Sequence, residues 1–171
     1  EVIFSRGPHY NISREAVRLE PRLATQLRAT LSPVVNHQGW TATDFHVHAE
    51  NSPDSSVTHR DRVASFLSED MQFLSSSDHD VLSEYEQVIK SMGVRTQVGS
   101  HVGVETTTQE LGHFIGFPMK FEMWTDSAEP KRLVGNNKPE WRGDPKTNRD
   151  TWPGVPPAKI FAEMRSKGLD G

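Results

Sequence analysis

The chain has 171 residues, a formal net charge of −4 and no cysteine. Without cysteine it can form no disulfide, thiol nucleophile or thiolate metal site, so any metal ion would be held by histidine and carboxylate ligands. The charge and the absence of a long Lys/Arg cluster argue against nucleic acid as a partner, and the absence of a long apolar run argues against a membrane. The sequence leaves the compartment and the oligomeric state open.

Residues 1–38 are expected to form a short β-rich segment. Apolar runs at 2–4, 15–19 and 24–31 are separated by glycine and proline, which is typical of β-strands. Because three strands bury little by themselves, we interpret the segment as the tail of a preceding β module. The alternative is a helix across residues 13–31.

Residues 39–171 follow a different rhythm, in which strands alternate with helices. Thr58 suits the N-cap of a helix over residues 58–68, and Ser83 with Glu86 has the form of a capping box for a second helix that Gly93 ends. A third helix is expected to begin at Pro157. This order of elements is typical of a parallel α/β sheet, whose sites form at the carboxyl ends of the strands.

Histidines and carboxylates fall at the expected strand ends. His46 and His48 lie two residues apart on an expected strand, so they share one face of it, as paired metal ligands must. Three later strand-like runs each carry a further donor: 71–80 ends near His79, 98–107 contains Glu105, and 112–118 opens with His113. Imidazole and carboxylate are donors of Zn, Mn and Fe sites, and a carboxylate can bridge two ions. The pattern therefore indicates a metal site.

These motifs and their order resemble those of one family of metallohydrolases, the PHP (polymerase and histidinol phosphatase) superfamily. The segments that carry the resemblance are Asp44-x-His46-x-His48, Ser52-Pro53-Asp54, Ser77-Asp78-His79-Asp80, Gly103-Val104-Glu105-Thr106 and Gly112-His113-Phe114-Ile115-Gly116-Phe117. They cover residues 39–118 and look closest to the metal-dependent phosphoesterases, a branch that also holds carbamate-hydrolysing relatives. The resemblance implies that residues 39–171 form the N-terminal part of a distorted (β/α)7 barrel.

The resemblance also implies two or three divalent ions, Zn, Mn or Fe, at the strand ends. Their protein ligands would be His46, His48, Asp54, His79, Glu105 and His113. In this scheme His46 and His48 hold a first ion, which Glu105 shares with a second ion on His113. Asp54 and His79 hold a third. Glu50 is the alternative to Asp54, because the commoner family spacing places this aspartate one residue nearer to the second histidine.

The remaining polar residues near these motifs are expected to play other roles. Asp44, Asp78 and Asp80 are predicted to accept hydrogen bonds from ligand imidazoles and so fix their tautomers. Four histidines are predicted not to be ligands, among them His59, expected on the exposed start of a helix; the others are His9, His37 and His101.

The chain departs from the family at its end, where a further histidine and a final Asp-x-His are expected. No histidine follows His113. We therefore expect a C-terminally truncated member in which each ion lacks one protein ligand and binds more weakly. Whether the fragment itself is active stays open.

The expected function is metal-dependent hydrolysis of a small-molecule phosphate ester by a metal-bridging hydroxide at a di- or trinuclear site. Two alternatives stay open: hydrolysis of a carbamate or carboxyl ester at the same site, and a non-catalytic metal-binding or interaction module. The proline- and tryptophan-rich residues 118–155 are interpreted either as a lid or substrate wall, or as an irregular excursion held against the barrel.

Overall fold

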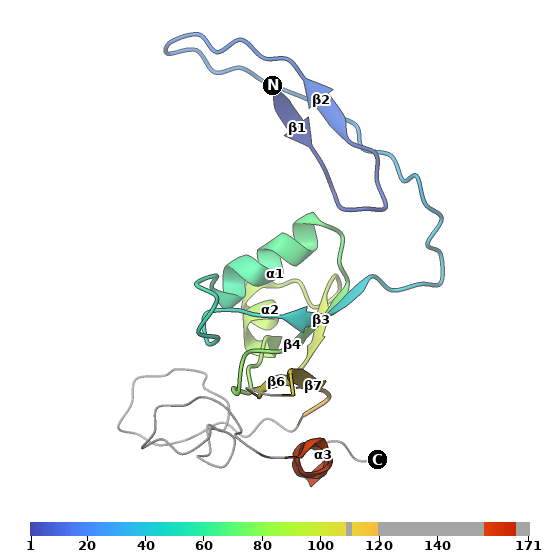
Figure 1. Cartoon of the computed structure of the whole chain (residues 1–171). Helices are drawn as coiled ribbons and strands as arrows, with labels where there is room; N and C mark the ends of the chain where they lie inside the picture. Colours follow the sequence, from blue (N-terminus) through green and yellow to red (C-terminus); the bar gives the residue numbers. More distant parts are fainter. Residues whose placement is uncertain (109–110, 120–155, 167–171) are drawn as a thin grey trace.

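The computed structural model describes residues 1–108, 111–119 and 156–166 (Figure 1). An extended arm, residues 1–38, leads into a region of alternating strands and helices. In the part of the chain that the structure describes, no helix is long and apolar enough to cross a membrane. The expectations for residues 120–155, which include the lid or wall, lie outside the described residues.

The centre of the molecule is a three-stranded parallel sheet in the order β3-β4-β5. Its strands are β3 (Thr43–Val47), β4 (Phe73–Ser76) and β5 (Gly99–His101), and the connecting helices are α1 (His59–Ser68) and α2 (Glu86–Met92). The alternation predicted from the sequence is confirmed, and the fold is α/β. Parallel strands place their carboxyl ends at one edge of the sheet, which is where the histidine motifs follow.

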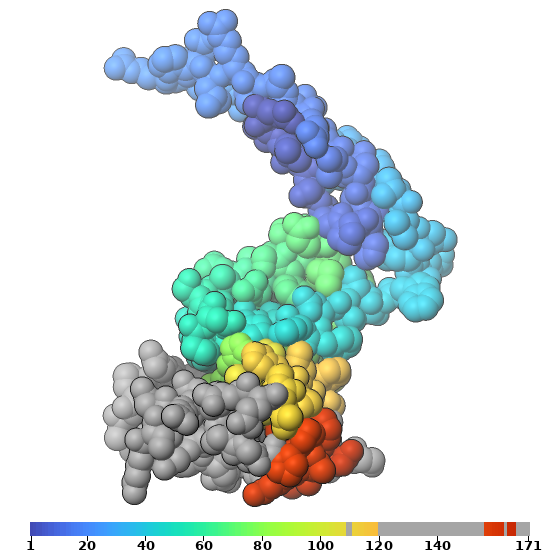
Figure 2. Space-filling model, in the orientation of Figure 1, coloured from blue at the N-terminus to red at the C-terminus, as the bar shows by residue number. Residues whose placement is uncertain are grey.

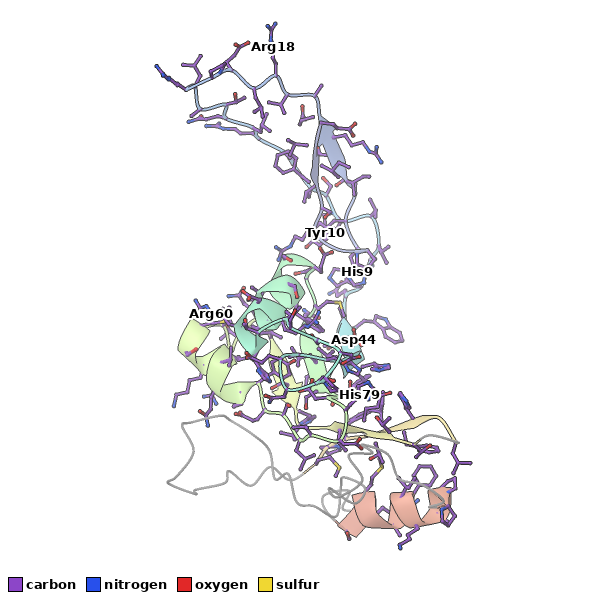
Figure 3. The ribbon with its side chains drawn as sticks, turned by 60° about the vertical axis from the view of Figure 1, so that its left-hand side comes forward. His9, Tyr10, Arg18, Asp44, Arg60 and His79 are labelled. Atoms are coloured by element: carbon purple, nitrogen blue, oxygen red, sulfur yellow. The ribbon has the colours of Figure 1, made fainter. Side chains whose placement is uncertain are left out.

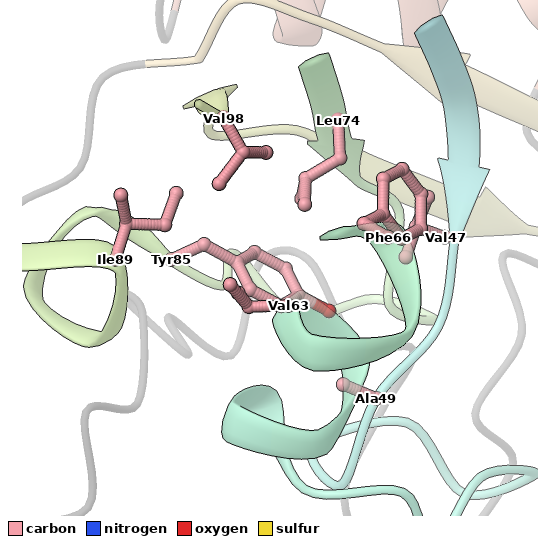
Figure 4. Packing of buried hydrophobic residues seen from close by; sticks show 8 residues of the cluster. All are labelled: Val47, Ala49, Val63, Phe66, Leu74, Tyr85, Ile89 and Val98. Carbon is pink, nitrogen blue, oxygen red and sulfur yellow. The ribbon is translucent and has the colours of Figure 1, made fainter. Parts of the chain in front are cut away.

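The helices pack on this sheet through one apolar cluster, which Figure 4 shows from close by. Its buried members are Val47, Ala49, Val63, Phe66, Leu74, Tyr85, Ile89 and Val98. Burial of each of its larger aliphatic and aromatic side chains stabilises the fold by roughly 1.5–3 kcal/mol. The cluster therefore fixes β3 and β4 against α1 and α2, and with them the segments that follow both strands.

The helix ends agree with the sequence in part. Thr58 caps α1 and accepts a hydrogen bond from the Asp61 amide, and α2 ends at Gly93 in the left-handed conformation with φ of 72°. The capping box is wrong: α2 has Tyr85 at its N-cap without a side-chain cap. The Ser83 hydroxyl instead donates to the carboxylate of Asp78. The Ser83 hydroxyl, which the sequence spacing assigned to the helix cap, is thus bound by the buried carboxylate of Asp78 outside the helix.

The run at 98–107 is not one strand. It divides into β5 in the parallel sheet and β6 (Val104–Thr107), which pairs antiparallel with β7 (His113–Gly116). The division falls at Gly103, where an added Cβ would come within 2.4 Å of the Ser76 carbonyl oxygen. Only glycine permits this approach of the two backbones. β6 is thereby directed across the carboxyl end of β4.

The helix α3 (Pro157–Ser166) packs on the β6–β7 pair through a second apolar cluster. The cluster comprises Leu82, Val104, Met119, Ile160 and Met164. The predicted start of this helix at Pro157 is confirmed.

The arm contains less regular structure than expected. Strands β1 (Val2–Phe4) and β2 (Ser13–Glu15) pair antiparallel, but residues 24–31 form no strand and the alternative helix over 13–31 is absent. The arm extends away from the sheet (Figures 1 and 2) and leaves Leu19 and Leu23 largely exposed. Among the described residues, a strand at 24–31 would have had no apolar surface to bury against, which explains why the run stays irregular.

Candidate metal centre

All six predicted metal ligands lie together at the carboxyl end of the parallel sheet. They come from four separate segments: β3 and the loop after it, the loop after β4, strand β6 and strand β7. Figure 3 labels Asp44, next to these residues in β3, and His79, and both lie on the sheet region rather than on the arm, which carries Arg18. Three groups of three donors have their ligand atoms within 4.8 Å of one another. These groups could hold metal ions.

Glu105 lies at the centre of this set. Its side chain is 4% exposed, and its Oε2 atom lies 3.0 Å from Nε2 of His46 and 2.9 Å from Nε2 of His48. Its other oxygen, Oε1, lies 2.8 Å from Nδ1 of His113. One buried carboxylate thus has three imidazole rings within hydrogen-bond reach.

A second group consists of His48, Asp54 and His79. Asp54 faces both rings, with Oδ1 at 3.2 Å from Nδ1 of His48 and Oδ2 at 3.4 Å from Nε2 of His79. A hydrogen bond from Ser52, together with the two histidines, holds the pKa of the Asp54 carboxyl below its usual value. Of the two candidates for this position, Asp54 is the one that the structure places at the centre.

The third group joins His79 to Glu105 and His113. The register of the hairpin explains this placement: Thr107 lies directly opposite His113, and direct partners share one face of a sheet. Glu105, two residues before Thr107, is on the same face. His48, His79 and Glu105 each belong to two groups, so the three groups form one continuous cluster.

His79 is fixed against β6 by the backbone. It forms a parallel bridge with Glu105, in which the Asp80 amide donates to the Glu105 carbonyl (2.9 Å) and the Glu105 amide donates to the Asp78 carbonyl (3.2 Å). Asp80 has a φ of 54°, in the left-handed region that aspartate tolerates better than most residues. Backbone conformations of this kind concentrate at functional sites, where surrounding contacts hold them.

The roles predicted for two aspartates are wrong. Asp44 accepts from the His46 backbone amide (2.9 Å), and Asp78 accepts from the Ala49 amide (2.7 Å) and the Ser83 hydroxyl. Within the described residues, neither accepts from the imidazole of a candidate ligand; each fixes the backbone beside one instead. Asp80 accepts from the Thr107 amide at 3.1 Å, a contact of the same kind.

Two hydroxyls contact the imidazole rings instead, and the sequence reasoning missed both. Thr107 Oγ1 lies 2.6 Å from Nδ1 of His79, and Ser52 Oγ lies 3.1 Å from Nδ1 of His48. A signal for each was available: Thr107 follows Glu105 by two residues and so shares its face of the strand, and Ser52 stands in the motif that contains Asp54.

The other histidines stay outside the cluster, with one correction. His59 is buried rather than exposed, and its Nδ1 lies 2.9 Å from Oε1 of Glu50. Glu50, the alternative to Asp54, is thus engaged at the start of α1. His101 lies against the ring of Phe73, and His9 stacks on His37 in the arm. In the ranges that the structure describes, none of these four histidines belongs to a group that could hold a metal.

The donor set fits a divalent cation. A carboxylate as buried as Glu105 is stable as an anion only where positive charge or hydrogen bonds offset its desolvation. The nitrogen–oxygen distances of 2.8–3.0 Å around it are typical of neighbouring ligand atoms on an ion with bonds of about 2 Å. Imidazole and carboxylate without thiolate suit Zn, Mn and Fe.

Comparison of the chain with protein-family models, with curated proteins and with solved structures finds no match. The function must therefore be inferred from the geometry of the cluster itself.

Proposed function

We propose that this chain is part of a metal-dependent hydrolase of the PHP type, whose centre binds two or three Zn, Mn or Fe ions. The observation that carries the proposal is Glu105, a buried carboxylate within 3.0 Å of three imidazole nitrogens from β3, the residue that follows β3, and β7. The order β3-α1-β4-α2-β5, with parallel strands, is the alternation from which a β/α barrel is built and is compatible with the proposed fold.

In this proposal His46 and His48 hold one ion, which the Glu105 carboxylate shares with a second ion on His113, while Asp54 and His79 hold a third. Ions in these positions would supply Lewis acidity, polarising a substrate oxygen and acidifying a water molecule. The carboxylates balance the positive charge, and the imidazoles fix its position. Such chemistry requires no side-chain nucleophile.

The exposure of the ligands favours a substrate that approaches from solvent. The side chains of His46, Asp54 and His113 are 56%, 54% and 45% exposed, whereas Glu105 at 4% forms the floor of the cluster. A small phosphate ester is the proposed substrate, because its oxygens can bind several ions at once. The proposal does not extend to the group beyond the ester bond, since the fold does not determine it.

The test is metal content and hydrolysis, measured together on the purified chain. We expect more than one equivalent of Zn, Mn or Fe after loading, and metal-dependent hydrolysis of p-nitrophenyl phosphate. Glu105→Gln should abolish both, because it removes the charge and keeps the shape. Glu20→Gln, the same change in the exposed arm, is the matched control and should alter neither.

The outcomes separate the alternatives. Hydrolysis of an aryl carbamate or carboxyl ester without hydrolysis of the phosphate would show that the substrate is not a phosphate ester, while the proposed metal centre would stand. Bound metal with no hydrolysis of any of the three would favour the metal-binding module. Failure of the loaded wild-type chain to retain metal would contradict the proposal.

A further inference from the structure

Ser52 is a small buried residue that contacts three of the candidate ligands at once. Its hydroxyl oxygen lies 2.7 Å from Oδ1 of Asp54, 3.1 Å from Nδ1 of His48 and 3.2 Å from the backbone nitrogen of His79. These three residues form one of the groups that could hold a metal ion. Ser52 itself is 5% exposed, and its amide donates to the Ala49 carbonyl at 2.8 Å.

The protons of this network can be assigned by counting. A serine hydroxyl has one hydrogen to donate and two lone pairs that accept. The Asp54 carboxylate only accepts and the His79 amide only donates, so the Ser52 hydroxyl donates to Asp54 and accepts from His79. The remaining lone pair faces Nδ1 of His48 at 3.1 Å, and Oδ1 of Asp54 faces the same nitrogen at 3.2 Å. Because neither oxygen has a further hydrogen to give, Nδ1 carries the proton and donates.

This assignment determines which nitrogen of His48 is available to a metal ion. Neutral imidazole has one N–H, so a proton on Nδ1 leaves Nε2 with its lone pair. That lone pair faces Oε2 of Glu105 across 2.9 Å. Two acceptors at this distance repel one another unless a positive charge lies between them, either a proton or, in the proposed centre, a metal ion. The contact with Ser52 therefore presents His48 to the same ion as Glu105.

We infer that Ser52 is a positioning residue of the metal centre, which holds Asp54, His79 and the metal-binding tautomer of His48 through a single hydroxyl. The inference rests on the proposed metal centre and adds a residue that contacts no ion itself. Ser52 does not serve as the nucleophile, because both lone pairs of its oxygen face hydrogen-bond donors and its side chain is buried among the ligands.

The test is a cobalt(II) titration of the metal-free chain, followed by the visible absorption bands, whose intensity reports coordination number. Replacement of a group that orients a metal ligand typically weakens metal affinity by about 10–100-fold. We expect Ser52→Ala to bind cobalt more weakly by this factor. We also expect the absorption bands of the most weakly bound cobalt ion to change in intensity. Ser55→Ala is the matched control, because in the described part of the chain the Ser55 hydroxyl accepts from the Val57 amide and contacts no candidate ligand.

A second pair of variants removes the effect of shape. Ser52→Thr keeps the hydroxyl, and Ser52→Val replaces it with a methyl group in a side chain of the same outline. Any strain from the larger side chain is common to both, and circular dichroism checks that both fold. We expect the threonine variant to bind cobalt more tightly than the valine variant by at least about 10-fold.

The outcomes distinguish the role of Ser52 from the existence of the site. Equal affinities for Ser52→Thr and Ser52→Val, with cobalt bound by the wild-type chain, would overturn the role of Ser52 and leave the metal centre standing. No cobalt bands in the wild-type chain would overturn the metal centre and, with it, the role of Ser52.

Discussion

The arm and the sheet region of this molecule distribute their side chains in opposite ways. The arm, residues 1–38, leaves apolar side chains in solvent, with Leu19 79% and Leu23 71% exposed. The sheet region, residues 43–108 and 111–119, buries polar ones, with Asp78 at 0% and Glu105 at 3%. Single exposed apolar residues are common on proteins, whereas a buried charge needs a partner. The informative half of the contrast is therefore the sheet region.

The contrast also concerns what fixes each region. In the arm, the ion pairs join exposed side chains: Arg14 pairs with Glu1, and Arg18 pairs with Glu20. In the sheet region, hydrogen bonds join residues from separate elements, such as Asp78 to Ala49 across 29 positions of the chain. Surface pairs contribute little to stability, and buried networks contribute more. Substitutions should therefore have large effects in the sheet region and small effects in the arm.

The largest effect is expected at Asp78. Replacement by alanine would leave the Ala49 amide and the Ser83 hydroxyl without their buried acceptor, and each such loss costs about 1–3 kcal/mol. We expect Asp78→Ala to lower the free energy of unfolding by about 2–4 kcal/mol, measured by urea denaturation of the metal-free chain.

The matched variant is Asp78→Asn, which keeps an oxygen for the Ala49 amide. Burial raises the pKa of the Asp78 carboxyl, so removal of the charge relieves part of the desolvation that the aspartate suffers. The free energy of unfolding should therefore fall by less than half as much in the asparagine variant as in the alanine variant. A loss below about 0.5 kcal/mol for Asp78→Ala would place it in the range of surface substitutions and refute the role of this network.

Asp78 also shows where prediction from the sequence succeeded and where it stopped. Periodicity located β3, β4, α1 and the strand-like runs that carry the candidate ligands, because strand and helix periods and chain order are local properties. The partners of Asp78, Ser52 and Thr107 depend on which backbones lie side by side, and no spacing rule contains that information. The same holds for Ser83. Its hydroxyl donates to the buried carboxylate of Asp78 and is therefore not available to cap α2.

The arm illustrates the opposite failure. The run at 24–31 has the alternation of a strand, but strand propensity needs a surface on which to bury one face. The described arm offers none, since its strands β1 and β2 have three residues each. A local pattern without a tertiary partner therefore gave a wrong expectation.

The next effect is expected at Thr107, on metal affinity. Thr107→Val removes the hydroxyl that lies 2.6 Å from Nδ1 of His79 while it keeps the shape of the side chain. Loss of such a contact should weaken metal binding by about 10-fold, measured by isothermal titration with zinc.

Thr106→Val provides the matched control on the neighbouring residue. The Thr106 hydroxyl is buried without a hydrogen-bond partner among the described residues, and successive residues of a strand point to opposite faces. We expect unchanged zinc affinity and equal or higher stability, because an unsatisfied buried hydroxyl is replaced by a methyl group. Equal zinc affinities for the two variants would show that Thr107 does not orient His79.

A smaller and pH-dependent effect is expected at Glu84, within the sheet region but outside the metal cluster. Burial raises the pKa of the Glu84 carboxyl, and its Oε2 atom has no hydrogen-bond partner in the part of the chain described. The folded state thus binds the proton more tightly than the unfolded state, where the pKa is about 4.3. Ionisation of Glu84 therefore subtracts stability as the pH rises above that value.

Glu84→Gln should remove this dependence. Near pH 4 the variant and the wild-type chain should have the same free energy of unfolding. As the pH rises through the folded-state pKa, the variant should become the more stable of the two, and the difference should level off at less than about 1 kcal/mol. Melting temperatures of both proteins between pH 4 and 8 measure the difference. An advantage that stays constant over this range would exclude the ionisation of Glu84 as its cause.

The smallest effect is expected where the arm meets the sheet region. Arg6 Nη2 lies 2.8 Å from Oδ1 of Asp70, in a pair whose arginine is 46% exposed, and pairs of this kind contribute about 0–1 kcal/mol. Arg6→Gln should therefore lower the free energy of unfolding by no more than about 0.5 kcal/mol and leave zinc affinity unchanged. Since salt screens exposed pairs, the difference should vanish in 1 M NaCl, where the Debye length falls to about 3 Å.

Arg18→Gln, which breaks a pair within the arm, is the control. If Arg6→Gln changed zinc affinity and Arg18→Gln did not, the arm would be coupled to the metal centre through its contact with Asp70, and the two regions could no longer be treated as independent.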